Sequence, residues 1–281
     1  MINFNGAAVA EEDVKLPVAN RGLFYGDSVF ETIRVINGKI IFWEDHYFRL
    51  MASMRIMRME IPSTFSPEFL ELEILNILKE NNLITKPARV RFTVLRKEGG
   101  LYTPASRDID YLIHTSELED PFYLLNEEPY EVELFKDHYI TSGLLSTIKT
   151  NNRAVNVLGS IFAKENAYSN CFLLNERKSI VEALNGNVFL VCDSKIKTPS
   201  LAEGVLNGIV RKQLLSIIKT MPDLEIEETS ISPFELQKAD EIFVTNIIVG
   251  IQPVTKYRKK EFANTVSKDL LSKLNVKARL G

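Results

Sequence analysis

The feature of the 281-residue sequence that most restricts its fold is a mixture of strand-like and helix-like apolar patterns without a strict strand–helix–strand repeat. Two apolar runs joined at Asn37-Gly38 predict a β-hairpin, because this pair suits a type I′ turn. Apolar residues at helical spacing follow over 45–59, and Ser66-Pro67 marks the start of a second helix. The patterns predict an α+β fold and argue against a Rossmann sheet.

The stretch 118–129 is acidic, contains two prolines and lacks clear periodicity. Such a segment is typical of a boundary between domains. We therefore predict an N-terminal α+β domain over 1–118, a linker over 119–129 and a C-terminal domain over 130–281. Within the C-terminal domain the patterns predict four strands and two helices: strands at 130–135, 171–175, 188–192 and 241–245, a helix over 154–168 and another that begins near Gly208.

The composition excludes several classes of protein. A net charge of -3 and a pI near 5.8 argue against a nucleic-acid binder. No apolar run approaches the length of a membrane helix, and the N-terminus lacks the pattern of a signal peptide. Two cysteines give no disulfide framework, and three scattered histidines have no metal-ligand spacing, so we predict a cytoplasmic protein without a metal site.

Lys149 is the first of four local features that chemistry could use. It follows the apolar stretch 143–148, which predicts a half-buried lysine at the end of a strand. Burial lowers the pKa of a lysine, and imine chemistry requires a lowered pKa. Taken alone, however, a lysine in this position is more often one whose side chain reaches solvent.

Three further features are equally weak in isolation. Glu182 has apolar flanks, but an exposed turn glutamate is the commoner case. Asn207-Gly208 at a helix start leaves backbone N–H groups for a phosphate, although most such sequences are plain N-caps. Arg49 lies in the helix predicted over 45–59, and its guanidinium could bind a phosphate with two hydrogen bonds. An arginine in such a position is, however, more often the partner of a surface salt bridge.

The order and spacing of these features change that interpretation, because together they resemble the class IV (fold type IV) family of pyridoxal-phosphate (PLP) enzymes. The family comprises branched-chain aminotransferases, D-amino-acid aminotransferases and aminodeoxychorismate lyases. The resemblance extends over nearly the whole chain and implies a two-domain fold like that of the D-amino-acid aminotransferases. The matching positions are Arg21, 25–34, His46, Arg49, Leu50, Lys149, Glu182, 187–189, 206–211 and 239–241.

The resemblance implies a role for each matching residue. Lys149 would carry the Schiff base with PLP and move the α-proton of the substrate. Glu182 would face the pyridine nitrogen, and Arg49 would bind the phosphate. The resemblance also implies cofactor-binding residues around the phosphate in the C-terminal domain: Asn187, Gly208, Ile209, Val210, Asn246 and Ile247. Two of these, Val210 and Ile247, stand where family members have threonine.

The reaction stays open between two chemistries. We favour an aminotransferase that acts on a small α-amino acid, of branched-chain type, and a 2-oxo acid. The patterns Lys149-x-x-Asn152-Arg153 and Asn246-Ile247-Ile248 are closer to the lyase, which eliminates pyruvate to give 4-aminobenzoate, although the arginine of the lyase loop is absent. A non-catalytic PLP-binding protein is the third alternative.

The resemblance also suggests residues that contact the substrate, and a state of assembly. Tyr25, Arg34 and Arg91 are the candidates for the substrate pocket, and Arg91 matches an arginine of the branched-chain group. Family members are homodimers, so we expect a homodimer here.

Overall fold

The computed structural model describes residues 1–280, which form two compact units. The first unit contains Met1–Pro121 together with Ile148–Asn152. The second unit contains Phe122–Thr147 and Arg153–Leu280. Both units mix helices with sheets, so the chain has the α+β content that the sequence predicts.

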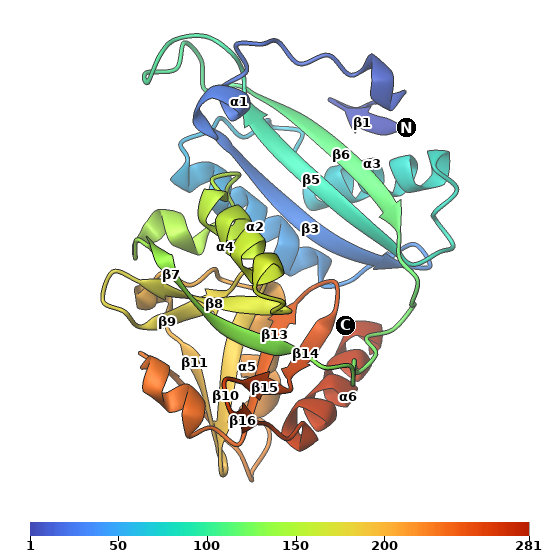
Figure 1. Cartoon of the computed structure of the whole chain (residues 1–281). Coiled ribbons are helices and arrows are strands. Elements are labelled where there is room, and N and C mark those ends of the chain that lie inside the picture. The colour runs from blue at the N-terminus through green and yellow to red at the C-terminus, as the bar shows by residue number, and fades with distance from the viewer. Residues whose placement is uncertain (281) are drawn as a thin grey trace. The chain divides into compact units, whose positions relative to one another are not determined.

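The first unit is built on one six-stranded antiparallel sheet with the order β2-β1-β6-β5-β3-β4 (Figure 1). Three long strands form its centre, since β5 pairs with β3 on one side and with β6 on the other. The strands are β1 (Ile2–Phe4), β2 (Ala7–Val9), β3 (Ser28–Ile36), β4 (Lys39–Ile40), β5 (Ala88–Arg96) and β6 (Ile109–Glu117). The helices are η1 (Glu11–Asp13, 3₁₀), α1 (Arg21–Tyr25), α2 (Trp43–Ile56) and α3 (Pro67–Glu80).

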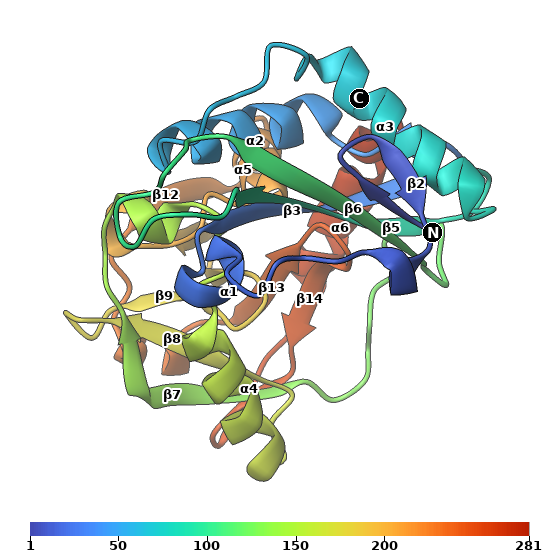
Figure 2. The ribbon, with the colours of Figure 1, turned by 90° about the horizontal axis from the view of Figure 1, so that it is seen from above.

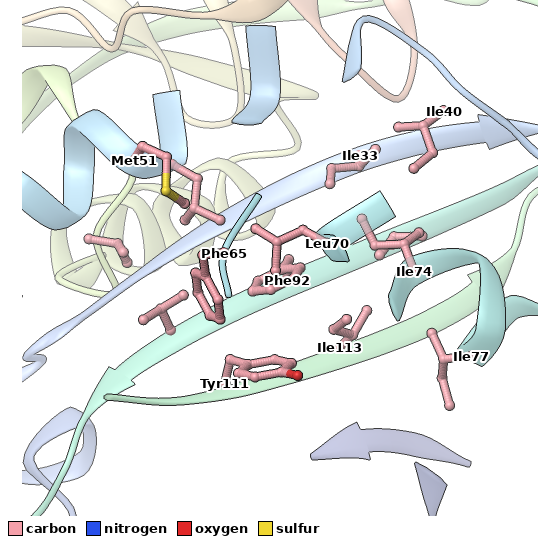
Figure 3. Packing of buried hydrophobic residues seen from close by; sticks show 14 of the residues in the cluster. Ile33, Ile40, Met51, Phe65, Leu70, Ile74, Ile77, Phe92, Tyr111 and Ile113 are labelled. Carbon is pink, nitrogen blue, oxygen red and sulfur yellow. The ribbon is translucent and has the colours of Figure 1, made fainter. Parts of the chain in front are cut away.

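Helices α2 and α3 cover the same face of this sheet, as Figure 2 shows from above. Their apolar sides meet alternate residues of the central strands and form one continuous core. In Figure 3, Met51 of α2 and Leu70 and Ile74 of α3 point toward Ile33 and Phe92 of the sheet. Burial of this apolar surface is the main force that holds the helices on the sheet.

Local signals in the sequence correctly place two elements of the first unit. Asn37 and Gly38 have φ angles of 49° and 72°, as a type I′ turn between β3 and β4 requires. The Ser66 side chain accepts a hydrogen bond from the Phe69 N–H at 3.1 Å, and Pro67 is the first residue of α3. The hairpin and the helix start are therefore confirmed.

The second unit contains two five-stranded sheets, with the orders β12-β11-β10-β13-β14 and β16-β15-β7-β8-β9. The first of these sheets consists of β10 (Asn187–Cys192), β11 (Lys195–Pro199), β12 (Glu225–Thr229), β13 (Glu241–Asn246) and β14 (Gly250–Val254). The other consists of β7 (Glu131–Ile140), β8 (Asn170–Asn175), β9 (Ile180–Ala183), β15 (Lys256–Tyr257) and β16 (Lys260–Glu261). The helices are η2 (Leu144–Thr147, 3₁₀), α4 (Ala154–Glu165), η3 (Leu201–Glu203, 3₁₀), α5 (Ile209–Ile218), η4 (Pro233–Gln237, 3₁₀) and α6 (Thr265–Leu280).

The segment before Lys149 is not the predicted strand. Residues Leu144–Thr147 form the 3₁₀ helix η2. The Ser146 and Thr147 hydroxyls donate to the carbonyls of Gly143 and Leu144, both at 2.7 Å. These local bonds offer the backbone an alternative to a strand ladder, which explains why the apolar stretch does not extend.

The domain division predicted from the sequence also differs from the structure around Lys149. The prediction places 148–152 in the C-terminal domain, whereas these residues belong to the first unit. Ile148 is part of the core of that unit, and Thr150 pairs with Val29 of β3. A linear boundary cannot anticipate a short segment that returns to an earlier unit.

Among residues 1–280, no helix combines the length and apolarity that a membrane crossing needs.

Candidate active site

Lys149 is held against β3 by its backbone. The Phe30 N–H donates to the Lys149 carbonyl at 2.8 Å, and the Asn151 N–H donates to the Ser28 carbonyl at 3.2 Å. The Lys149 Nζ lies 4.8 Å from the centre of the Phe30 ring, a distance that allows a cation–π contact. The lysine is half-buried, as the sequence predicts.

Arg91 of β5 contacts the same aromatic ring. Its Cζ lies 3.8 Å from the centre of the buried Phe30 ring, and its Nη2 donates to the Asn151 Oδ1 at 2.9 Å. Arg91 therefore contacts both the ring below Lys149 and the segment that carries it. Of the three predicted substrate residues, Arg91 is the one that contacts the same aromatic ring as Lys149.

Tyr25 and Arg34 have other surroundings. The Tyr25 ring lies 4.8 Å from the Arg21 Cζ and 5.7 Å from the centre of the Tyr102 ring. Arg34 lies buried in β3 and donates from Nη2 to the carbonyl of Asp120. This contact gives Arg34 a structural role, because it binds the end of the segment Met1–Pro121 to β3.

Arg49 belongs to a buried charge cluster between α2 and β3 that consists of Glu31, His46 and Arg49. The Arg49 Nε and Nη2 donate to the two Glu31 carboxylate oxygens at 2.7 and 2.6 Å, and His46 Nδ1 lies 2.8 Å from Oε2. Burial alone would raise the pKa of Glu31, but the charge and hydrogen bond of Arg49, together with His46, lower it to about 2. Arg49 is thus a largely buried partner of Glu31 and not a surface salt bridge.

Glu182 lies buried in β9 of the second unit, so the exposed-turn alternative is wrong. The Leu206 N–H donates to Glu182 Oε2 at 3.0 Å, and the Asn187 Nδ2 donates to the Leu206 carbonyl at 2.9 Å. Leu206 therefore links the carboxylate of β9 to the amide of β10.

Helix α5 begins at Ile209, and its N-cap residue Gly208 provides no side-chain cap. The first N–H groups of a helix have no acceptor within the helix, and they carry the positive end of its dipole. A Cβ atom on Gly208 would lie 1.9 Å from the Asn187 Oδ1, so glycine at this position leaves room for the Asn187 side chain beside the start of α5. Ile209 and Val210, the next two residues, are themselves buried.

An unpartnered hydroxyl lies near this helix start. Thr245 of β13 stands directly opposite Asn187 of β10, so the two side chains lie on the same face of the sheet. The Thr245 Oγ1 is buried and, among the described residues 1–280, has no hydrogen-bond partner. Because buried hydroxyls are rarely left unbonded, this atom is suited to a ligand.

Asn246 and Ile247 form the turn after β13. The Asn246 Oδ1 accepts hydrogen bonds from the N–H groups of Ile248 and Val249, at 2.9 and 3.0 Å. The Ile247 carbonyl accepts from the Tyr123 hydroxyl at 3.1 Å. The Asn246 side chain therefore stabilises the turn, because its Oδ1 occupies the N–H groups of Ile248 and Val249.

Each unit thus gathers its own set of predicted site residues. The first unit brings Lys149 and Arg91 to one ring, and the second brings Glu182, Asn187 and Gly208 to Leu206. Four residues that the structure places beside the predicted ones have no role assigned from the sequence, namely Phe30, Glu31, Asn151 and Thr245. Glu31 carries the one signal that was available, since it interrupts the apolar alternation of Val29, Ile33 and Val35 in β3.

Comparison with known proteins identifies the relatives of this chain. The sequence profile of the family described as amino-transferase class IV matches residues 28–257. A protein of Methanocaldococcus jannaschii assigned as a branched-chain-amino-acid aminotransferase is 29% identical over 277 residues, which cover 98% of this chain and 94% of that protein. The D-alanine aminotransferase of Staphylococcus epidermidis is 28% identical over 262 residues, with 90% of this chain and 87% of that protein covered.

Solved structures give the same result for the fold. The branched-chain amino acid aminotransferase of Escherichia coli superposes with a TM-score of 0.85 at 25% identity, covering 96% of this chain and 91% of that one. A Legionella pneumophila protein assigned as a 4-amino-4-deoxychorismate lyase has a TM-score of 0.84 at 21% identity, covering 95% and 97%. The chain belongs to the class IV aminotransferase family and has fold type IV, so both predictions from the sequence are confirmed.

Proposed function

We propose that the protein is a PLP-dependent aminotransferase that moves an amino group between a small α-amino acid, with the branched-chain type favoured, and a 2-oxo acid. The family match over residues 28–257 carries this proposal. The branched-chain relative, 29% identical over 98% of the chain, supports the substrate class. The D-alanine aminotransferase is nearly as similar, so the stereochemistry of the substrate has to be measured.

Each unit, taken by itself, offers groups that suit PLP. In the second unit, the uncapped start of α5 and the buried Thr245 hydroxyl offer donors that suit a phosphate. Glu182, fixed by the Leu206 N–H, offers a carboxylate to a pyridine nitrogen. In the first unit, Lys149 offers an amine for the covalent bond to PLP, and Arg49 offers a guanidinium to the phosphate.

The chain's own residues would then divide the chemistry. Bound PLP supplies an electron sink that stabilises negative charge at the substrate's α-carbon. Lys149 Nζ holds the cofactor and afterwards moves the proton to and from that carbon. Glu182 keeps the pyridine nitrogen protonated, because a carboxylate beside it favours the charged form. Arg91, with its cation over Phe30, is the candidate that binds the carboxylate of the substrate.

The lyase alternative loses part of its support when its residues are seen in the structure. Asn152, which matches the lyase pattern, donates from Nδ2 to the Gly26 carbonyl at 3.3 Å. A Cβ atom on Gly26 would lie 2.3 Å from the Asn152 Oδ1, so the two residues pack closely. Asn246, the other residue of lyase type, closes the turn after β13. Both asparagines therefore have structural roles that favour neither reaction.

A half-reaction separates these alternatives. Purified holoenzyme is mixed with L- and D-amino acids of branched-chain and small type, and the formation of the 2-oxo acid and of the aminated cofactor is measured. An aminotransferase converts its cofactor with at least one of these donors. No conversion with any donor, together with pyruvate release from aminodeoxychorismate, would refute the transferase and support the lyase. No turnover in either assay would support a non-catalytic PLP-binding protein.

We further propose that the protein is a cytoplasmic homodimer. Val157, Leu158 and Ile161 expose about half of each side chain on one side of α4, and an exposed apolar surface of this kind is typical of a subunit interface. The cysteines Cys171 and Cys192 are unpaired, which fits a reducing compartment. Sedimentation equilibrium of the wild type and of Ile161→Glu tests the assembly, since a variant that remains dimeric would exclude this surface.

A further inference from the structure

The Glu31 cluster is charged although it lies within an apolar core. Val29, Ile33 and Val35 of β3 are core residues, and Glu31 shares their face because side chains alternate along a strand. Glu31 and His46 have side-chain exposures of 1% and 0%, whereas Arg49 has 11%. Arg49 is therefore the member of the cluster whose side chain is most exposed.

The sequence builds this cluster from two elements. His46 and Arg49 are three residues apart in α2, so both side chains project from the same side of the helix. That side also carries Leu50 and Met54, which are core residues, and it therefore faces β3. Glu31 receives hydrogen bonds from both residues of α2 at distances of 2.6–2.8 Å.

The charge states in the cluster follow from its burial. The Glu31 carboxyl is ionised at neutral pH, since its pKa is about 2. Burial lowers the pKa of His46, against the raising effect of Glu31, so the ring is neutral and its Nδ1–H donates to the carboxylate. The Nε2 atom of the ring is buried and has no partner among residues 1–280. The cluster thus contains one anion, one cation and a neutral donor.

Stability alone does not account for such a cluster. Buried ion pairs contribute little net stability compared with well-packed apolar residues of the same volume. The geometry instead fixes a direction. A guanidinium holds its five N–H groups in one plane, and two bonds to a carboxylate set the orientation of that plane and of all five groups.

We propose that Glu31 and His46 are positioning residues that orient the guanidinium of Arg49 toward a phosphate, with Glu31 acting directly and His46 acting through Glu31. The inference rests on the proposed function, in which this phosphate belongs to PLP. Glu31 and His46 do not touch the ligand. Their substitution therefore weakens recognition of the phosphate and leaves recognition of the rest of the cofactor intact.

The test compares PLP with pyridoxal, which has the same ring and aldehyde but no phosphate. Dissociation constants of both are measured on apoenzyme of the wild type and of Glu31→Gln by absorbance and by borohydride trapping on Lys149. Glu31→Gln is expected to lose about tenfold in affinity for PLP, which is the scale of one charge-assisted hydrogen bond, and less than about twofold for pyridoxal. Equal losses for the two ligands, or no loss for PLP, would overturn the proposal.

Matched variants separate orientation from general damage. Glu73→Gln is the control, because Glu73 is another buried glutamate of the first unit, bonded to Asn3 and Tyr111, and its PLP-to-pyridoxal ratio should equal that of the wild type. In an Arg49→Gln background, Glu31→Gln should cause no further loss for PLP. A further loss there would show that Glu31 does not act through Arg49 and would also overturn the proposal.

A second pair of variants keeps the test decisive if Glu31→Gln does not fold. His46→Leu removes the donor to Glu31 and replaces it with an apolar side chain that suits the core, and it should lower the PLP-to-pyridoxal ratio about threefold. His46→Asn retains a donor and should restore the ratio, whereas an unchanged ratio in His46→Leu would exclude the role of His46. The proposed function fails separately, if the wild type itself neither traps PLP on Lys149 nor prefers PLP to pyridoxal.

Discussion

The close approach between Gly208 and the Asn187 side chain makes the start of α5 sensitive to substitution. In Gly208→Ala the new Cβ would lie 1.9 Å from the Asn187 Oδ1, well inside van der Waals contact. The backbone angles of Gly208, φ -71° and ψ 142°, suit any residue, so the effect is steric and not conformational. Either α5 or Asn187 must move.

The expected magnitude follows from three contributions. Forcing an extra methyl group into a packed site costs about 1–3 kcal/mol. Displacement of Asn187 also breaks the hydrogen bond from its Nδ2 to the Leu206 carbonyl, for about 1–2 kcal/mol more. Replacing glycine restricts the unfolded chain and offsets about 0.4–1 kcal/mol. We expect Gly208→Ala to lower the free energy of unfolding by about 1–5 kcal/mol.

Urea denaturation of the apoprotein, followed by circular dichroism, measures this change. Gly143→Ala is the matched control in the same unit, because nothing lies within 4 Å of its added Cβ, and its stability should stay within about 0.5 kcal/mol of the wild type. In an Asn187→Ala background the Gly208→Ala penalty should largely disappear, since the clashing atom is gone. A Gly208→Ala protein as stable as the wild type, or an equal penalty in both backgrounds, would refute the steric reasoning.

Three further predictions use other parts of the molecule. Because burial lowers the pKa of His46, the unfolded state binds more protons below about pH 6.5, so wild-type stability should fall as the pH is lowered below this value. Urea titrations should show a smaller fall in His46→Leu, and equal falls would contradict this assignment. Glu182→Gln should retain PLP on Lys149 but slow the half-reaction about 100-fold, as measured by stopped-flow absorbance, whereas an unchanged rate would exclude the role of its charge. Burial raises the pKa of Cys171 to about 11, so a thiol reagent at pH 8 should modify the partly exposed Cys192 first, and faster labelling of Cys171, located by peptide mass, would show that β8 opens.

Elements with strong local signals were predictable from the sequence. The Asn37-Gly38 turn and the start of α3 depend on residues that are adjacent in the chain, so their chemistry can be read directly. The start of α5 at Gly208 follows in the same way. The family resemblance then supplied the identity of the candidate site residues, which no local pattern could provide.

The structure adds the partners of those residues, and these depend on contacts between distant parts of the chain. From the sequence, Arg49 could bind a phosphate or form a surface salt bridge. No local pattern shows that Arg49 of α2 is bonded to Glu31 of β3, because the two residues belong to different elements. The strand predicted before Lys149 is wrong because the Ser146 and Thr147 hydroxyls favour a 3₁₀ turn. A pattern of apolar residues does not show that side-chain hydrogen bonds compete with strand pairing.

The return of Ile148–Asn152 to the first unit has a consequence for how the chain is made. A ribosome that has completed Pro121 has not yet synthesised Ile148, which completes the core of the first unit, or Thr150, which pairs with Val29. About 30 more residues must follow, a delay of about 2–6 s at about 5–20 residues per second. During this interval the newborn first unit lacks part of its core and the strand partner of β3. The segment that carries Lys149 is thus also the last part of the chain needed to complete the first unit.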